Sequence, residues 1–455
     1  MYQELQVNSS AVDSASTPSV APLRVGLIGL GTVGSGTYAV LLRNADVIYA
    51  RTGRRIEISM IAARNLARAA SQVNKHITLV DDPFLIVNHP DIDVVVEVIG
   101  GTTLARELVL QAIANGKHVV TANKALLAEH GNEIFAAARA NRVVVSYEGA
   151  VAVSIPIIKV LREGLTANRI EWVVGIINGT TNYILSKMKA TGVSFSDALA
   201  EAQRLGYAES DPSFDVEGTD AAHKLTLLAS NAFGVPIQFE KVHTEGITEL
   251  ESVDVAHAER LGYCVKLLGI AKRGSQGLEL RVHPTLIPSS HLLANVHGSM
   301  NAIMVKSDAA GVTMHYGAGA GSEQTASAVI ADLVDIGRIS RSTHQDRVPS
   351  IAFQPNAISA LPVASIAEVV SSHYLRVEVC NPVQTVPTIL VHLSQAGVRV
   401  QRLEVLDRPS NPELGTVLVL TQPTKGNTLR ALISNIEKWS SVIGCVRTIR
   451  MESLD

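Results

Sequence analysis

The sequence has few cysteines, little net charge and no long apolar run, and each shortage excludes a class of protein. Three cysteines (Cys264, Cys380 and Cys445) lie far apart among 455 residues. This argues against a disulfide framework or a zinc site and favours a reducing, cytoplasmic location. A formal net charge of −3 offers no basic surface for nucleic acid or an anionic membrane. Apolar runs are short and interrupted by glycine, asparagine or charge, so no transmembrane helix is predicted.

The N-terminal segment also lacks the features of a targeting signal. Residues 1–22 have neither a basic start nor a long apolar core, so we expect a mobile tail rather than a signal peptide. The rest of the composition, with 47% hydrophobic and 18% charged residues, is that of a soluble globular protein. A chain of 455 residues is long enough for two to three domains with separate cores.

Residues 23–150 alternate between apolar strands and helical stretches. Strands are expected from Leu23 up to Gly29, over 56–65, over 93–101, at the start of 116–131 and over 142–149. This alternation is typical of βαβ units around a parallel sheet. It predicts an α/β fold that begins with a doubly wound, Rossmann-type nucleotide-binding domain.

The pattern changes after position 150 and predicts two further units. Residues 151–315 mix helices and strands as an α+β domain, and 316–338 form a glycine-rich loop and a long amphipathic helix. Residues 346–369 are interpreted as a linker. The order strand, helix, strand, strand, helix, strand over 370–455 is the ferredoxin-like plan.

A dinucleotide-binding motif opens the first unit. Gly29, Gly31 and Gly34 lie between a strand and a helix, where glycines allow a tight turn and a close approach of backbone to pyrophosphate. A flexible turn is the alternative. Arg64 follows the second strand, where an NAD-selective site would place an acid, and this favours the 2′-phosphate of NADP. A solvated surface arginine is equally consistent with its position.

Carboxylates gather around one lysine in "GYAESDPSFDVEGTDAAHKL", residues 206–225. Asp220 and Lys224 are four residues apart on one helix face, and such a lysine can move the proton of an alcohol during hydride transfer. An ordinary surface ion pair has the same spacing. Glu209 and Asp215 lie in the preceding turn, where they could receive a substrate ammonium group. Lys124 comes at the end of a strand, where a doubly wound sheet builds its site. These residues alone predict an NAD(P)-dependent oxidoreductase.

Taken together, several segments resemble homoserine dehydrogenase from about Leu23 to the C-terminus. They are "GLGTVG", "TANKALL", "YEGAVAVSIPII", "NGTTNYIL", "AQRLGYAESDPSFDVEGTDAAHKL", "YCVKLLGIAKR" and "GAGAGSEQTASAV", with an ACT-like domain after them. The resemblance implies reversible oxidation of L-homoserine to L-aspartate 4-semialdehyde, on the route to threonine, methionine and isoleucine. It also implies a homodimer or homotetramer.

The resemblance also implies roles for individual residues. Lys224 would be the proton donor and acceptor, Asp220 would position the reacting oxygen, and Lys124 would line both cofactor and substrate. The substrate-binding set would be Glu209, Asp215, Asp220 and Thr181. The nucleotide would contact Gly29, Gly31, Thr32, Val33, Gly34, Arg64, Lys124, Gly206 and Gly321. A monovalent cation, usually sodium, would be held at Glu148, Val151, Val153 and Ile155. The helix that starts near Gly321 would complete the nucleotide domain, with residues 316–345.

Three short segments depart from the family pattern. Val153-Ser154 replaces the usual Gly-Gly, and a β-branched residue would strain an unusual turn there. Gln324 stands where proline is usual. Residues 381–386 lack the glycine of the ACT effector turn, which leaves two alternatives open: a dimerisation module without threonine feedback, or a module that still binds threonine. A non-catalytic sensor on the same scaffold, or an oxidoreductase for another semialdehyde, is the alternative.

Overall fold

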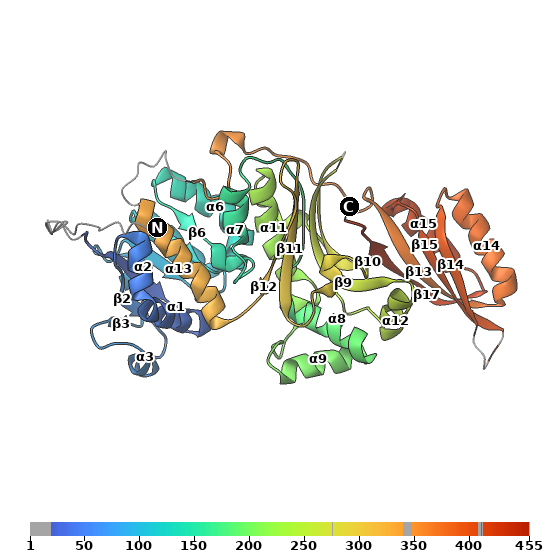
Figure 1. The fold of residues 1–455 in the computed structure, drawn as a ribbon, viewed down its shortest axis with the longest axis horizontal. Coiled ribbons are helices and arrows are strands. Elements are labelled where there is room, and N and C mark those ends of the chain that lie inside the picture. Colours follow the sequence, from blue (N-terminus) through green and yellow to red (C-terminus); the bar gives the residue numbers. More distant parts are fainter. Residues whose placement is uncertain (1–19, 275, 340–347, 408–410, 412, 455) are drawn as a thin grey trace, which may run out of the picture.

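The structure is a computed structural model, and it describes residues 20–274, 276–339, 348–407, 411 and 413–454. Residues 1–19 of the expected N-terminal tail (1–22) lie outside the described residues. So do residues 346 and 347 of the expected linker (346–369). Figure 1 shows three regions in a row: a parallel sheet with its helices, a curved central sheet, and a C-terminal sheet with two helices.

A six-stranded sheet forms the first region, in the order β3-β2-β1-β4-β5-β6. All of its neighbouring strands are parallel. The strands are β1 (Leu23–Ile28), β2 (Ile56–Ala62), β3 (Thr78–Val80), β4 (Val94–Glu97), β5 (His118–Thr121) and β6 (Val145–Ser146). The helices are α1 (Thr32–Arg43), α2 (Ala45–Thr52), α3 (Leu66–Gln72), α4 (Phe84–Val87), α5 (Thr103–Ala114) and α6 (Lys124–Ala140). This is the doubly wound arrangement that the sequence predicts.

Strand β6 is shorter than the strand expected over 142–149. The N–H of Val143 donates to the carbonyl oxygen of Ala138, 3.0 Å away, and so closes the end of α6. On the other side, Glu148–Ala150 turns into a 3-10 helix. Local hydrogen bonds at both ends therefore leave only Val145 and Ser146 to pair with β5.

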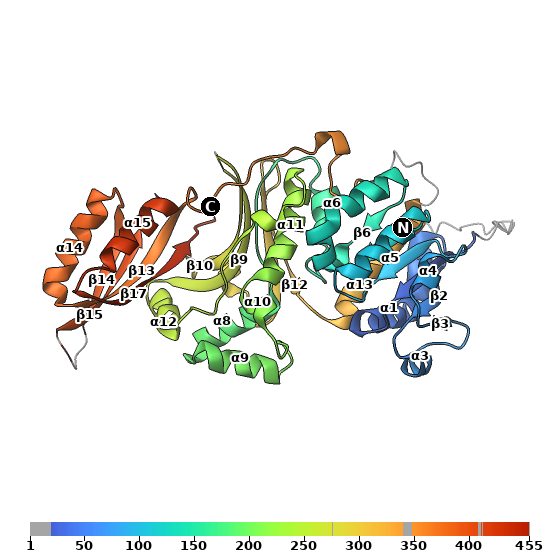
Figure 2. The same ribbon diagram turned by 180° about the vertical axis from the view of Figure 1, so that it is seen from behind.

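Helix α13 (Ser322–Ile339) returns to this sheet from far along the chain. Ala326, Val329, Leu333 and Ile336 of α13 are buried in one apolar cluster with Leu27 of β1. Both views show α13 beside α1 (Figures 1 and 2). The parallel-sheet region therefore includes a segment that follows the whole central region in sequence.

The central region is built on antiparallel strands, apart from one short strand, and its helices lie on one side (Figure 1). Its strands are β7 (Ile170–Ile176), β8 (His243–Thr244), β9 (Tyr263–Gly274), β10 (Gly277–Pro288), β11 (Met300–Ser307) and β12 (Gly311–Ala318). The short β8 is parallel to β10. Its helical segments are α7 (Ile157–Lys159), the π-helical turn Val160–Gly164, α8 (Gly179–Thr191), α9 (Phe195–Arg204), α10 (Ser213–Val216), α11 (Thr219–Phe233) and α12 (Ser252–Arg260), with 3-10 turns at Phe239–Lys241 and Leu292–Asn295. Helix α11 is buried along its length and packs on β7, β9 and β10.

In this region the sequence predicts strands near 170–178 and 277–287, and strands β8, β9, β11 and β12 were not predicted. The end of β12 covers residues 316–318, which the sequence assigned to a glycine-rich loop. The register pairs Met300 with Ala318 and Asn301 with Gly317, so the neighbouring strand β11 holds these small residues extended. Pairing across the sheet thus overrides their weak strand propensity.

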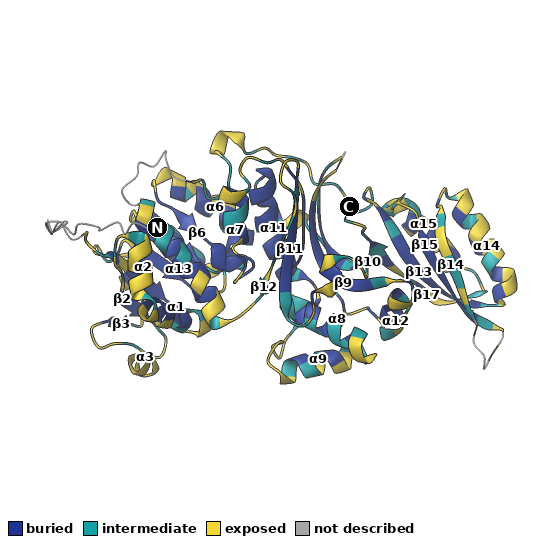
Figure 3. Ribbon diagram, in the orientation of Figure 1, coloured by how far each residue is buried: buried dark blue, intermediate teal, exposed yellow. Residues whose placement is uncertain are grey.

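The C-terminal region has the element order that the sequence predicts. After a 3-10 turn at Pro355–Ala357 come β13 (Val370–Cys380), α14 (Pro382–Gln395), β14 (Val400–Asp407), β15 (Leu414–Thr421), the short β16 (Thr424–Lys425), α15 (Gly426–Ile436) and β17 (Val442–Met451). The sheet faces that meet α14 and α15 are buried, and the outer surface of α14 is exposed (Figure 3).

The central and C-terminal strands form one continuous sheet. Strand β17 pairs in parallel with β10, with Thr285 opposite Arg450 and Leu286 opposite Met451. The combined sheet has eleven strands, with β12 and β14 at the ends of its main path. The last strand of the chain is therefore hydrogen-bonded directly to the sheet that supports α11. No helix within the described ranges is long and apolar enough to cross a membrane.

Candidate active site

The turn between β1 and α1 contains the predicted phosphate-binding loop. Gly29 has a φ of +104°, a conformation that favours glycine. Gly34 lies so close to the carbonyl oxygen of Gly29 that a Cβ would not fit. Thr32 and Val33 are the first residues of α1, whose free N–H groups face this turn. A helix N-terminus behind a close backbone turn is suited to a pyrophosphate group.

A cleft of about 630 Å³ lies beside this loop, at the carboxyl edge of the parallel sheet. Gly31, Arg64 and Arg68 line one part of it, and residues 98–104 line another. Arg64 and Arg68 are both exposed, so their guanidinium groups are available to an anionic ligand. The sequence reasoning identified Arg64 and missed Arg68, which comes four residues later in α3.

Lys124 is the first residue of α6 and directly follows the loop after β5. Asn123 caps this helix: its side-chain oxygen accepts the N–H of Leu126 at 3.1 Å. The amide nitrogen of Asn123 donates to the carbonyl oxygen of Gly101 at 2.7 Å. These bonds hold the start of α6 at the carboxyl edge of the sheet, where Lys124 faces the central region.

Asp220, in the first turn of α11, joins two lysines from different helices. Its side chain is 3% exposed. Oδ1 lies 2.7 Å from Nζ of Lys124, and Oδ2 lies 2.7 Å from Nζ of Lys224. Lys224 also donates to the carbonyl oxygen of Ile177 at 2.8 Å. Helices α6 and α11 lie side by side (Figure 2), so the cluster bridges the parallel-sheet and central regions.

Burial and charge act in opposite directions on this cluster. Burial lowers the pKa of Lys224 below its usual range, although Asp220 partly opposes the shift. Burial also disfavours the charge of Lys124, but the carboxylates of Asp220, Asp215 and Glu209 raise its pKa overall. Burial favours the neutral acid at Asp220, yet the two lysines hold its pKa well below the usual range. Lys224 is therefore the lysine of this cluster whose proton is released more easily.

Asp215 is held next to Asp220 by the start of helix α8. The side-chain nitrogen of Asn178 donates to Oδ1 of Asp215 at 2.7 Å and to Oδ2 of Asp220 at 2.8 Å. The hydroxyl of Thr180 donates to Oδ2 of Asp215 at 3.1 Å. The hydroxyl of Thr181 donates to Oδ1 of Asn178 at 2.9 Å, so Thr181 supports Asn178 rather than either carboxylate.

Gly206 and Glu209 lie in the turn between α9 and α10, and both are exposed. Gly206 has a φ of +78°, which favours glycine. The turn is tied down by Gln203, whose side-chain nitrogen donates to the carbonyl oxygen of Glu209 at 3.0 Å. The carboxylate of Glu209 contributes to the raised pKa of Lys124, so it belongs to the same acidic surround.

His223, next to Lys224 on α11, is a buried group that the sequence reasoning missed. Its ring packs edge-on against Phe214 and Phe239, with centroids 5.3 and 4.3 Å away. Its Nδ1 has no hydrogen-bond partner among the described residues. Burial lowers the pKa of His223, which therefore lies beside the cluster as a neutral ring. No motif distinguishes such a histidine from an ordinary core residue.

The N-terminus of α13 lies against α1, close to the phosphate-binding loop. Ser322 donates from its hydroxyl to the carbonyl oxygen of Thr32. Gly321 has a φ of +137°, and Oε1 of Gln324 lies where a Cβ on Gly321 would be. The glutamine that replaces the usual proline thus folds its side chain over Gly321.

The loop after β6 has the strained backbone that the sequence predicts. Val153 has a φ of +55°, an unfavourable conformation for a β-branched residue. The carbonyl oxygens of Val151 and Val153 accept no hydrogen bond from the described residues, whereas that of Ile155 accepts the N–H of Ile157 at 2.8 Å. Within the described ranges, no cluster of three or more His, Cys, Asp or Glu side chains could hold a metal ion.

Glu148 lies at the start of this loop with its carboxyl group buried. The carboxylate accepts the N–H groups of Ile158 at 3.0 Å and Lys159 at 2.9 Å. Burial raises the pKa of Glu148 to about 7, although these bonds oppose the shift. Its side chain is thus used to hold the start of α7.

Comparison with known proteins places this geometry in a family. The family model for homoserine dehydrogenase matches residues 156–334, and the model "Homoserine dehydrogenase, NAD binding domain" matches residues 29–148. The homoserine dehydrogenase of Pseudomonas aeruginosa is 52% identical over 434 residues, which covers 95% of this chain and 100% of that protein. The chain belongs to the homoserine dehydrogenase family.

Solved homoserine dehydrogenases share the fold as well. The crystal structure from Thiobacillus denitrificans is 53% identical, with a TM-score of 0.92 over 96% of this chain and 100% of that chain. A hyperthermophilic archaeal homoserine dehydrogenase in complex with NADPH is 25% identical, with a TM-score of 0.61 over 71% of this chain and 99% of that chain. The protein is therefore an oxidoreductase that interconverts L-homoserine and L-aspartate 4-semialdehyde, with an NAD(P)-binding domain.

Proposed function

We propose that Lys224 is the proton acceptor and donor in this homoserine dehydrogenase, and that Asp220 and Lys124 position it and the substrate. The observation that carries the proposal is the sharing of Asp220 by two lysines at the carboxyl edge of the parallel sheet. This is the edge where a doubly wound sheet binds its ligand. The lysine on the α11 side has the lowered pKa that an acid–base group requires.

The proton step follows from the contacts of Lys224. An ammonium group has three N–H donors, and contacts between described residues use two, to Ile177 and Asp220. The third N–H has no acceptor among the described residues and would meet the substrate oxygen. In oxidation the neutral amine takes the hydroxyl proton as the C–H bond breaks, and in reduction the ammonium group returns it. A nicotinamide cofactor, when bound in the neighbouring cleft, would supply the hydride chemistry in both directions.

The acidic surround would select the zwitterionic substrate. Asp215 is only half-buried, and Glu209 is exposed, so both carboxylates can meet a substrate ammonium group. Asn178 and Thr180 hold Asp215 by direct hydrogen bonds. Thr181 would act through Asn178. A substrate without the amino group would lose these charge-assisted bonds.

The cleft beside the glycine loop would hold NADP in preference to NAD. Gly29, Gly31 and Gly34 would receive the pyrophosphate with Thr32 and Val33, and Gly206 and Gly321 would also contact the nucleotide. Arg64 and Arg68 both line the cleft beyond β2, where the ribose 2′-phosphate is placed in this fold. Two guanidinium groups there favour a phosphate over a free hydroxyl.

Two further features are proposed, a cation site and an assembly module. The free carbonyl oxygens of Val151 and Val153 suit a hard monovalent cation such as sodium, with Glu148 and Ile155 beside them. The C-terminal region would be an ACT-like module that assembles a homodimer or homotetramer without binding threonine. Asn381, with a φ of +48°, takes the left-handed position in the altered turn before α14. Light scattering tests the assembly, and calorimetric titration with L-threonine tests the statement about binding.

The central test measures initial rates with L-homoserine and either NADP⁺ or NAD⁺ by nicotinamide absorbance. We expect Lys224→Ala to lose most turnover and still bind NADP⁺, whereas Arg64→Ala should weaken NADP⁺ much more than NAD⁺. Native turnover in Lys224→Ala would contradict the acid–base role. Equal losses for both nucleotides would show that Arg64 does not meet the 2′-phosphate.

A further inference from the structure

The last strand of the chain makes an ion pair with a loop of the central region. Arg450 of β17 places Nη1 2.6 Å from Oε2 of Glu245. The other carboxylate oxygen of Glu245 lies 2.8 Å from Nε2 of His243. Burial favours the neutral acid at Glu245, but His243 and Arg450 hold its pKa well below the usual range. Glu245 is therefore a charged group that is fixed from two sides.

The backbone on either side of Glu245 is packed between β10 and the turn 216–218, which precedes α11. The N–H of Glu245 donates to the carbonyl oxygen of Val282 at 2.8 Å, and the N–H of Ile247 donates to that of Val216 at 2.8 Å. Gly246 lies so close to Val216 and Glu217 that a Cβ would not fit. Segment 244–247 is thus in direct contact with the turn 216–218.

The turn 216–218 connects the two carboxylates of the active site. Gly218 has a φ of +88°, and a Cβ there would lie 3.0 Å from Cγ2 of Thr244. Asp215 precedes this turn and Asp220 follows it, and both accept hydrogen bonds from the same nitrogen of Asn178. A shift of the turn against Thr244 would therefore change the spacing of Asp215 and Asp220.

We infer that Glu245 and Arg450 are positioning residues for the dehydrogenase reaction. The C-terminal strand holds segment 244–247 against the turn 216–218, and the turn holds Asp215 and Asp220 at the substrate. The inference rests on the roles proposed above for these carboxylates. Arg450 acts on homoserine binding through Glu245 and does not touch substrate or cofactor.

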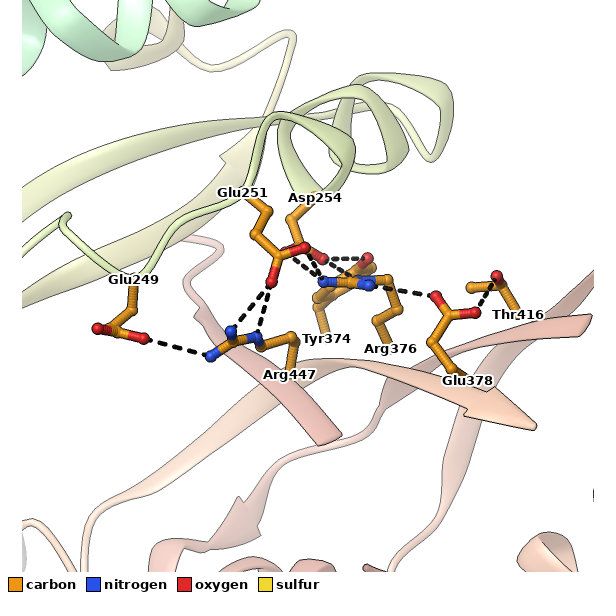
Figure 4. A network of polar contacts seen from close by, with 8 residues as sticks. All are labelled: Glu249, Glu251, Asp254, Tyr374, Arg376, Glu378, Thr416 and Arg447. Atoms are coloured by element: carbon orange, nitrogen blue, oxygen red, sulfur yellow. Dashed lines mark hydrogen bonds and ion pairs between the residues drawn. The ribbon is translucent and has the colours of Figure 1, made fainter. Parts of the chain in front are cut away.

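Arg447 provides a matched control on the same strand. Its guanidinium group lies 3.0 Å from Oε1 of Glu251 and 3.4 Å from Oε2 of Glu249 (Figure 4). Both arginines thus connect β17 to the central region. The ion pairs of Arg447 lead to the start of α12 and not to the turn 216–218.

The experiment compares Arg450→Met with Arg447→Met in steady-state kinetics on the full chain. We expect Arg450→Met and Glu245→Gln each to raise the KM for L-homoserine roughly tenfold and to lower kcat less, with the KM for NADP⁺ near native. The double variant should be no worse than either single one, because both remove the same interaction. Arg450→Lys should recover part of the loss, and Arg447→Met should retain the native KM for L-homoserine.

A native KM for L-homoserine in Arg450→Met, an equal rise in Arg447→Met, or additive effects in the double variant would each overturn the inference. If Arg450→Met does not fold, Arg450→Lys and Glu245→Gln decide the question by the same KM ratio. Lys224→Ala belongs in the same series. Native turnover in Lys224→Ala would contradict the proposed function. If Lys224→Ala loses turnover as expected but Arg450→Met keeps the native KM for L-homoserine, only the positioning role is overturned.

Discussion

Two buried aspartates in this protein are surrounded by positive charge in different ways. Asp220 of the active site meets the ammonium groups of Lys124 and Lys224. Asp254 of α12 meets Arg376 of β13, with Nε 2.7 Å from Oδ1 and Nη2 3.1 Å from Oδ2, and accepts the hydroxyl of Tyr374 at 3.0 Å (Figure 4). The first cluster joins the parallel-sheet and central regions, and the second joins the central and C-terminal regions.

The difference lies in the cations. Arg376 also donates to Glu251 at 2.9 Å and to Glu378 at 3.1 Å, so its planar fork meets three carboxylates at once. Burial opposes its charge, but the bonds to Asp254 and Glu378 raise the pKa of Arg376 further. Lys224 has fewer partners and a lowered pKa. A buried arginine network thus fixes two regions to each other, whereas a buried lysine keeps a proton that can move.

The largest expected effect is on catalysis when Lys224 is replaced by another cation. Lys224→Arg keeps the charge beside Asp220 but cannot release a proton at working pH. We expect kcat to fall by about 10²- to 10⁴-fold, the usual range for a lost acid–base group. Steady-state kinetics measure the loss, and NADP⁺ titration shows whether the cofactor cleft is intact. If kcat of Lys224→Arg stays within a few-fold of native, the Asp220 cluster does not need a cation that can release its proton, and the functional distinction between the two clusters fails.

The reverse exchange at the other cluster should affect stability instead. Arg376→Lys supplies a single ammonium group, which cannot reach the carboxylates of Asp254, Glu251 and Glu378 together. We expect the free energy of unfolding to fall by about 3 kcal/mol, near the lower end for a broken buried pair. Urea unfolding measures this loss, and kcat per folded molecule should stay near native. A large fall in kcat at native stability would contradict the structural role.

The junction of the central and C-terminal regions should also weaken in mild acid. Burial, with the nearby charge of Arg450, lowers the pKa of His373 of β13 from 6.5 to about 4. The unfolded chain therefore binds a proton between these values that the folded chain does not. Stability should fall as pH drops from 6.5 towards 4, by up to about 3 kcal/mol from this group. His373→Gln should flatten the slope, and an unchanged slope would place the acid sensitivity elsewhere.

The smallest effect is expected at the exposed rim of the second cluster. The side chain of Glu249 is 84% exposed and lies 3.4 Å from Arg447. Because water screens such a pair, Glu249→Gln should change the free energy of unfolding by at most about 0.5 kcal/mol. The same urea experiment compares it with Arg376→Lys. If Glu249→Gln lowered the free energy of unfolding as much as Arg376→Lys, the number of ion pairs, rather than their burial, would decide stability here.

The sequence was sufficient for features that depend on local order. The G-x-G-x-x-G turn, the placement of Lys124 after β5 and the pairing of Asp220 with Lys224 all follow from short spacings. The strain at Val153 was also predictable, because a β-branched residue stands where the family has glycine. Each of these depends on neighbours within a few residues, and periodicity and turn chemistry act at that range.

Contacts between distant segments could not be predicted in this way. The pair Lys124–Asp220 joins two helices, and Glu245–Arg450 joins positions 205 residues apart. The parallel pairing of β10 with β17 likewise depends on how the C-terminal region packs. Arg68 and His223 have no motif of their own. In each case, tertiary packing decides which distant residues meet, and the spacing of residues along one sequence does not reveal that packing.

The measurement that tests the account most directly is the pH dependence of single-turnover L-homoserine oxidation on enzyme saturated with NADP⁺. If Lys224 accepts the proton, the rate should rise with pH through one apparent pKa below the ordinary lysine value of 10.5. The residual rate of Lys224→Ala should be far lower and should lack this rise. A rate that is independent of pH, or an unchanged rate and profile in Lys224→Ala, would contradict the assignment of proton transfer to Lys224.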